Sequence, residues 1–300
     1  MKISSNRSRR IVMVAAGAAI ICACAILVMV VYPRSSRLAK QQFMTVAHRG
    51  GAGAAPENTL AAFRMGMEAG ADALELDIHL SRDGVIMVMH DPLLARTTKK
   101  EGSIVDYSYE ELKSLDAAML HPESGRFGTQ QIPTLEDVLQ LIKSQERNVQ
   151  LQVEIKLKAD ETRYEGIEEK LVAMLTSYGM RERTTVISFD FPTLQTIHEL
   201  DPSLKRGALI SKKFMASIGS KGPSAVAKAL ADLKVDYAAV NYTYLSEKLY
   251  KALREETLSI GAWTVNDAKT MQKLMGMGVD FITSDYPSLL VQEAAKYAST

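Results

Sequence analysis

Three acidic residues occupy positions where they could hold a metal ion. Glu75 and Asp77 are spaced i, i+2 in the apolar run ALELDIHL, and Glu154 lies in the similar run LQVEIK. In a β-strand this spacing places two side chains on one face, about 7 Å apart. Buried carboxylates are costly unless they bind a cation or pair with basic side chains. An all-oxygen site suits one divalent cation, Ca²⁺ or Mg²⁺, better than Zn²⁺. Internal Asp–Arg and Glu–Lys pairs are the alternative.

Two histidines are placed for proton transfer. His48 ends the run TVAH, and His90 ends the run VIMVMH. A pair of imidazoles that titrate near neutrality can take a proton from a nucleophile and give one to a leaving alkoxide. His79 shares the strand face of Glu75 and Asp77, and it could either join them or be hydrogen-bonded in the strand wall. These residue types predict metal-assisted hydrolysis with His48 and His90 as acid and base.

Repeated strand–helix units are predicted to position these side chains, because short apolar runs alternate with longer amphipathic ones. The predicted strands are Thr45–His48, Ala73–Leu80, Leu151–Lys156, Thr185–Ser188, Arg206–Ile210, Tyr237–Asn241, Ser259–Thr264 and Phe281–Thr283. The predicted helices are Leu60–Ala69, Leu135–Lys143, Tyr164–Tyr178, Thr193–Leu200, Ser224–Leu233, Ser246–Glu255, Ala268–Met275 and Pro287–Tyr297. Eight units in about 250 residues are typical of a TIM (β/α)₈ barrel, whose active site lies at the C-terminal ends of the strands. A doubly wound sheet is the alternative, but we find no G-x-G-x-x-G or P-loop at the right place.

One segment departs from this repeat. Between the extended run Val85–His90 and Pro133 lies a stretch rich in Gly, Ser, Pro and charge. It is too long for an ordinary connection between a strand and a helix. We therefore predict an insertion of about residues 91–132 on one face of a single catalytic domain that spans residues 43–300.

The first 42 residues differ in composition from the rest. Ile11–Tyr32 is an uninterrupted uncharged run. At a helical rise of ~1.5 Å per residue it is long enough for the roughly 30 Å hydrocarbon layer, and it exceeds the apolar core of a signal peptide. We predict a retained single-pass transmembrane anchor between a basic cytoplasmic segment, 1–10, and a linker, 33–42. Four basic residues precede this run and three follow it, a small excess that favours a cytoplasmic N-terminus and an extracytoplasmic catalytic domain. The two cysteines, Cys22 and Cys24, fall in this run, so the globular part has no thiol.

The distribution of charge bears on the class of partner. The chain has a formal net charge of +1, but residues 1–40 hold seven Lys and Arg and no acid. The remainder carries 29 basic against 35 acidic residues, a balance of −6. Binding of a nucleic-acid backbone requires a basic surface. We therefore exclude nucleic acid as the predicted substrate.

The candidate residues fall within an ordered series of motifs. HRG, PENT, ELD and HDP are followed by LDAA, IPTLEDVL, VEIK, GAWTVND and MGVDFITSDYP. In this order and spacing they closely resemble the glycerophosphodiester phosphodiesterase (GDPD) family, over nearly everything from Val46 to Pro287. The resemblance implies a TIM barrel with a small insertion at about 91–132. It also implies hydrolysis of a small-molecule or lipid-derived phosphodiester to an alcohol and sn-glycerol 3-phosphate.

The same resemblance assigns roles to individual residues. It implies metal ligands at Glu75, Asp77 and Glu154, catalytic histidines at His48 and His90, and phosphate-contacting cations at Arg49 and Lys156. Trp263 is predicted to form an apolar wall for the glycerol or headgroup, with a core plug as the alternative. Asn58 and Thr59 of PENT are predicted to cap the first helix. In the insertion, MLHPESGRFG replaces the family's usual glycine and aromatic pattern, which predicts an altered substrate entrance.

Two other functions are weighed against this one. A phospholipase of the lysophospholipase D or phosphatidylinositol phospholipase C type shares the barrel and the histidine pair, and a membrane anchor would suit it. A catalytically silent barrel that binds glycerophosphates belongs to a different class, and the intact His48, His90 and carboxylates argue against it. The attacking nucleophile is left as either water or the neighbouring glycerol hydroxyl.

Overall fold

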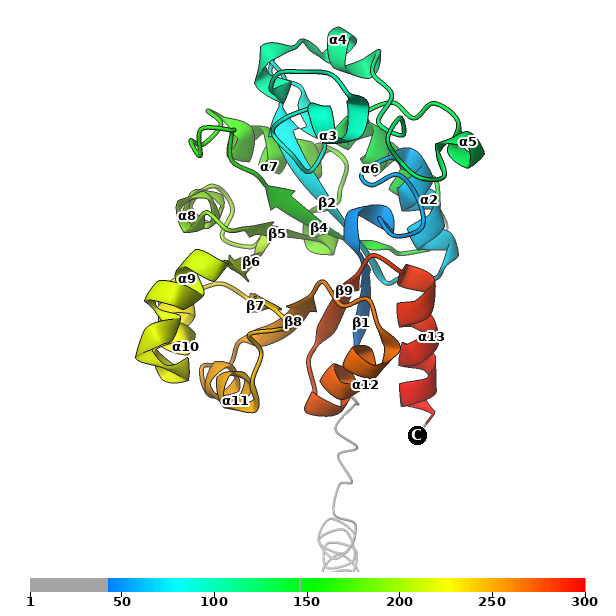
Figure 1. Cartoon of the computed structure of the whole chain (residues 1–300). Coiled ribbons are helices and arrows are strands. Elements are labelled where there is room, and N and C mark those ends of the chain that lie inside the picture. Colours follow the sequence, from blue (N-terminus) through cyan, green and yellow to red (C-terminus); the bar gives the residue numbers. More distant parts are fainter. Residues whose placement is uncertain (1–42, 146, 300) are drawn as a thin grey trace, which may run out of the picture. The chain divides into compact units, whose positions relative to one another are not determined.

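The computed structural model describes residues 43–145 and 147–299 (Figure 1). The predicted anchor, residues 11–32, and its flanking segments, 1–10 and 33–42, lie outside the described residues. Among the helices that are described, none combines the length and the apolar character needed to cross a bilayer. The described residues belong to one compact unit, Phe43–Thr300.

Eight parallel strands close into a barrel in chain order, because β1 pairs with β2 on one side and with β9 on the other. The barrel strands are β1 Met44–Ala47, β2 Ala73–Leu80, β4 Gln150–Ile155, β5 Thr184–Ser188, β6 Lys205–Ile210, β7 Tyr237–Asn241, β8 Ser259–Trp263 and β9 Phe281–Ser284. All eight predicted strands are confirmed, with ends that differ by no more than one residue. The TIM barrel is therefore confirmed and the open doubly wound sheet is wrong.

Helices cover the outside of this barrel (Figure 1). They are α2 Leu60–Glu68, α6 Leu135–Lys143, α7 Ile167–Ser177, α8 Phe191–Leu200, α10 Pro223–Asp232, α11 Glu247–Glu255, α12 Ala268–Met277 and α13 Pro287–Ala298. A further helix, α9 Lys212–Ser217, was not predicted, because six residues are too few to display a helical period. Its start is nonetheless encoded locally, since the Ser211 side chain accepts a hydrogen bond from the Phe214 amide.

Alternate side chains of the strands point to opposite sides of the barrel wall. Leu74 and Leu76 belong to the apolar cluster between the barrel and its helices, so Glu75 and Asp77 face the interior. Deeper in the interior, the rings of Tyr237 and Phe281 meet edge to face with centroids 4.8 Å apart. These rings occupy the space where Gly207 and Gly261 have no Cβ. Aromatic rings from the first residues of β7 and β9 thus fill this part of the barrel interior.

The predicted insertion carries its own small core. It follows β3 Ile86–Val88, which pairs antiparallel with the extended C-terminal part of β2. Short helical segments then follow: α3 Ala95–Thr98, η2 Ile104–Asp106, α4 Tyr109–Lys113 and α5 Ser124–Phe127. Leu94, Ile104 and Leu112 from this region are buried in one cluster with apolar side chains of β3 and of the segment that leads into α6. The insertion is therefore packed against the rim of the barrel on the β2 side (Figure 1).

Candidate active site

The three predicted metal ligands converge. Glu75, Asp77 and Glu154 each offer an oxygen within 4.8 Å of the others, and all three are buried. Their meeting follows from the sheet register, which places Asp77 of β2 opposite Glu154 of β4 and Glu75 opposite Gln152. Side chains at i and i+2 of two neighbouring strands then form a single cluster on the inner face.

The cluster concentrates negative charge in a buried place. Burial, and then the neighbouring charges of Asp77 and Glu154, raise the pKa of Glu75 well above its ordinary value. Burial likewise raises the pKa of Glu154 to about 7, against the opposing effect of Lys156. Burial also disfavours the charged form of Asp77, yet the positive charges of Lys156 and Arg49 hold the pKa of Asp77 well below its ordinary value. Without a cation, burial thus favours the protonated forms of Glu75 and Glu154. A bound cation would displace these protons and neutralise the carboxylates.

Two basic side chains contact the cluster. The Lys156 amino group lies 2.9 Å from Glu154 Oε1 and 3.4 Å from Asp77 Oδ1, and Arg49 Nε lies 3.6 Å from Asp77 Oδ2. The internal ion pairs that we considered as an alternative are therefore present. They leave three carboxylates against two cations, and Asp77 Oδ1 is buried without a hydrogen-bond partner. The donor set, all carboxylate oxygens at close range, therefore fits a divalent cation.

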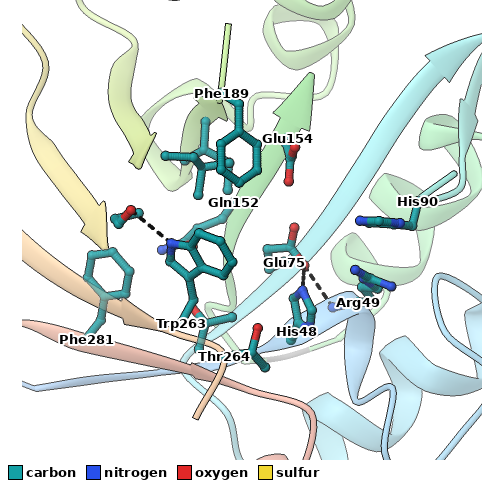
Figure 2. A pocket seen from close by; sticks show the side chains of 14 residues that line it. His48, Arg49, Glu75, His90, Gln152, Glu154, Phe189, Trp263, Thr264 and Phe281 are labelled. Atoms are coloured by element: carbon teal, nitrogen blue, oxygen red, sulfur yellow. Dashed lines mark hydrogen bonds and ion pairs between the residues drawn. The ribbon is translucent and has the colours of Figure 1, made fainter. Parts of the chain in front are cut away.

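His48 lies at the end of β1, in a tight turn that also positions Arg49. Arg49 has a left-handed backbone conformation (φ 52°), and its amide donates a 2.9 Å hydrogen bond to Glu75 Oε2. The His48 imidazole lies with Nδ1 2.6 Å from Asp285 Oδ1 and Nε2 3.9 Å from Glu75 Oε2. Nδ1 donates to the Asp285 carboxylate, which leaves Nε2 on the side of the carboxylate cluster. Figure 2 shows His48 and Arg49 beside Glu75.

His90 is held in the same way on the other side of the cluster. Its Nδ1 lies 2.6 Å from Asp91 Oδ1, so Nε2 is again the ring nitrogen available for proton exchange. The His90 carbonyl lies 3.1 Å from Nε2 of the buried His79, whose Nδ1 is 2.7 Å from the Tyr164 hydroxyl. His79 therefore has partners at both ring nitrogens and belongs to the barrel wall. Burial lowers the pKa of His79 to about 4, so His79 stays neutral near neutrality.

The PENT motif supports the cluster in a way that we did not predict. Thr59 caps α2 as expected, since its side chain accepts from the Ala62 amide. The cap assignment of Asn58 is wrong: this residue has φ 56°, and its amide nitrogen donates a 2.8 Å hydrogen bond to Asp77 Oδ2. The physical reason is that a left-handed asparagine can turn its side chain toward β2 while the next residue begins the helix.

A cavity of about 170 Å³ is lined by Glu75 and Glu154 of the carboxylate cluster (Figure 2). Its charged wall contains both predicted catalytic histidines, His48 and His90, and its opposite wall contains Phe189, Trp263 and Phe281. Trp263 Nε1 donates a 2.9 Å hydrogen bond to the Ala239 carbonyl, which leaves one ring edge fixed and the ring facing the cavity. Arg49 lines the cavity, whereas Lys156 is turned to the carboxylates and is not among the lining residues.

Several residues of the site were not predicted from the sequence. Asp285 and Asp91 back the two histidines, and Asn266 in turn donates a 2.6 Å hydrogen bond to Asp285 Oδ2. Gln152 lines the cavity with a buried amide nitrogen that has no partner. Asp91 adjoins His90, and Asp285 follows the last predicted strand, so the rule that strand ends build the site could have identified both.

Comparison with known proteins identifies the family to which the chain is similar. Residues 48–289 match the model of the glycerophosphoryl diester phosphodiesterase family. A glycerophosphodiester phosphodiesterase of Caldanaerobacter subterraneus is 33% identical over 255 residues, which cover 84% of this chain and 98% of the relative. One from Bacillus altitudinis is 33% identical and covers 82% and 96% of the two chains. The structure of an Oleispira antarctica phosphodiesterase in complex with the product sn-glycerol-3-phosphate is similar with a TM-score of 0.70, at 28% identity, covering 84% of this chain and 96% of that one.

Proposed function

This chain belongs to the glycerophosphoryl diester phosphodiesterase family, and we propose that it hydrolyses glycerophosphodiesters to an alcohol and sn-glycerol 3-phosphate. The observation that carries the proposal is a buried carboxylate cluster on the wall of a cavity that two aspartate-backed histidines share. The relatives of similar length that are named for this activity, and the product held by the Oleispira antarctica structure, support the same substrate class.

The residues suited to hold a divalent cation, Ca²⁺ or Mg²⁺, are Glu75, Asp77 and Glu154. When bound, such a cation supplies polarisation of a phosphate oxygen and neutralisation of charge. The Arg49 guanidinium on the cavity wall and the Lys156 ammonium beside the carboxylates add positive charge, which stabilises the negative charge that grows on the phosphate.

The two histidines move protons in this proposal. One Nε2 takes the proton of the attacking water or glycerol hydroxyl as its oxygen bonds to phosphorus, and the other gives a proton to the alkoxide as its bond to phosphorus breaks. The aspartates at 2.6 Å accept from Nδ1 of His48 and of His90 and orient both rings. The base enters the reaction with Nε2 unprotonated, and the acid enters it with Nε2 protonated. Trp263 and Phe189 form the apolar side against which the glycerol or headgroup carbons lie.

The test is turnover of glycerophosphocholine by the purified full-length protein. We expect equal amounts of choline and sn-glycerol 3-phosphate with Ca²⁺ or Mg²⁺, and neither product after complete chelation. Activity that survives metal removal would contradict the cation site, and the absence of turnover across choline, ethanolamine, inositol and glycerol diesters would contradict the substrate class. Faster cleavage of lysophospholipids than of any of these diesters would favour a lysophospholipase D.

We also propose that Ile11–Tyr32 anchors the enzyme in a membrane as a single span, with the barrel on the extracytoplasmic side. The support is the uncharged length of this run and the basic residues that precede it. Membranes extracted with alkaline carbonate should retain the protein, and protease added outside intact cells should digest the catalytic domain. Release of the protein by carbonate, or a protected catalytic domain, would contradict the anchor or its orientation.

A further inference from the structure

Arg96 joins two acidic residues at the rim of the site. Its Nε donates to Asp91 Oδ2, and its two terminal nitrogens donate to Glu57 Oε2 at 2.9 Å and Oε1 at 2.5 Å. Asp91 is the residue that backs His90, and Glu57 also accepts from Arg49 at 3.0 Å. The Arg96 guanidinium, from α3 of the insertion, thus connects two carboxylates. Asp91 is the partner of His90, and Glu57 is the partner of Arg49.

The other histidine has an equivalent arrangement. Asp285, which backs His48, uses its second carboxylate oxygen to accept a 2.6 Å hydrogen bond from the Asn266 side chain. In both pairs one carboxylate oxygen faces the imidazole and the other is fixed by a donor from a different segment. A carboxylate held at one oxygen only can rotate about its last bond, whereas one held at both keeps the imidazole in one orientation.

We propose that Arg96 is a positioning residue, which fixes Asp91 and through it the His90 imidazole. The inference rests on the role given to His90 in the proposed function. Glu57 anchors the far side of the guanidinium, so that the donor to Asp91 cannot swing away into solvent. The planar fork of arginine suits this task, because it binds one carboxylate with two nitrogens while the third points to another.

Two other roles for Arg96 do not fit the geometry: binding of the substrate, and holding the insertion against the barrel. Arg96 is not among the residues that line the cavity, although Arg49 and His90 are. The insertion has its own buried apolar core, so its packing does not depend on one half-exposed side chain. Removal of Arg96 should therefore slow the chemical steps more than it weakens substrate binding or folding.

The experiment is a double-mutant cycle on the full-length enzyme with glycerophosphocholine. We expect Arg96→Met to lower kcat by about 10- to 100-fold, as for a catalytic group displaced by up to ~1 Å, with KM nearly unchanged. In the Asp91→Asn background the same change should have little further effect, because the link to His90 is already broken. Arg96→Lys should fall between wild type and Arg96→Met, since an ammonium can replace only part of the fork.

The controls separate the outcomes. Arg126→Met removes another exposed arginine of the insertion, which pairs with Glu123, and should leave kcat unchanged. An equal loss from Arg96→Met in both backgrounds, a rise in KM alone, or unchanged activity would overturn the proposal. Thermal unfolding of each variant identifies a folding defect, and Arg96→Lys supplies the rate data if Arg96→Met does not fold. Wild-type turnover and its loss in His90→Ala are measured alongside, so a failure of the proposed function is seen independently of Arg96.

Discussion

Replacement of Glu154 by glutamine should make the metal-free protein more stable while it abolishes most activity. Burial raises the pKa of Glu154 from 4.5 to about 7. The folded metal-free protein therefore binds more protons than the unfolded chain between these values, and its stability falls as pH rises through about 7. At 1.36 kcal/mol per pKa unit, the charged carboxylate costs about 3 kcal/mol at pH 8. Glutamine has nearly the same shape and no charge, so it escapes this cost.

The assay is urea unfolding in excess chelator at pH 5 and pH 8, for wild type and Glu154→Gln in the same detergent. At pH 5, where the folded Glu154 is protonated but the unfolded carboxyl is mostly ionised, we expect the variant to be more stable by less than about 1 kcal/mol. At pH 8 we expect the variant to be more stable by up to about 3 kcal/mol. Glu123→Gln, at an exposed carboxyl of the insertion, is the control and should show no such dependence on pH. A variant less stable than wild type at pH 8 would contradict this prediction, because it would mean that the pair with Lys156 stabilises the fold by more than burial and charge repulsion destabilise it.

Three further predictions concern the same site. Asp285→Asn should lower kcat by about 100-fold with a smaller change in KM, because His48 loses its fixed orientation; initial rates with glycerophosphocholine check this. Asn58→Ala should weaken binding of Ca²⁺ or Mg²⁺ by about 10-fold, since Asp77 loses a buried hydrogen bond; calorimetric titration measures it, and an unchanged affinity would contradict it. Cation binding at pH 6 should release protons from Glu154 and Glu75, because burial raises the pKa of both, and binding should tighten as pH rises through about 7. Calorimetry in two buffers of different ionisation enthalpy measures the protons released, and identical heats would count against this prediction.

Much of the fold was predictable because the strands are buried on both sides and have clear boundaries. The run ALELDIHL shows why the candidate ligands could be identified as well: leucine and isoleucine face the helices at every second position, so the two acids between them must face the interior. Confinement of charge to the inner face is a strong signal, because burial there is costly without a cation or a counter-charge.

Some site residues could not be predicted because their positions depend on the closure of the barrel, which joins distant parts of the chain, or on irregular backbone. Asp285 meets His48 only because β9 pairs with β1, which joins residues far apart in the chain. Arg96 lies on a single turn of helix in the insertion, where no period predicts the direction of a side chain. Asn58 was misassigned because asparagine favours both helix caps and left-handed turns, and only the structure distinguishes the two.

A crystal structure of the enzyme grown with Mn²⁺ as a stand-in for the natural cation, with the ion located by anomalous scattering, tests the proposed cation site directly. We predict one ion bound by oxygens of Glu75, Asp77 and Glu154, at about 2.0–2.6 Å from each, beside the cavity that His48 and His90 share. An anomalous peak elsewhere, or Lys156 still paired with both Asp77 and Glu154 at saturating Mn²⁺ and no ion bound there, would contradict this site.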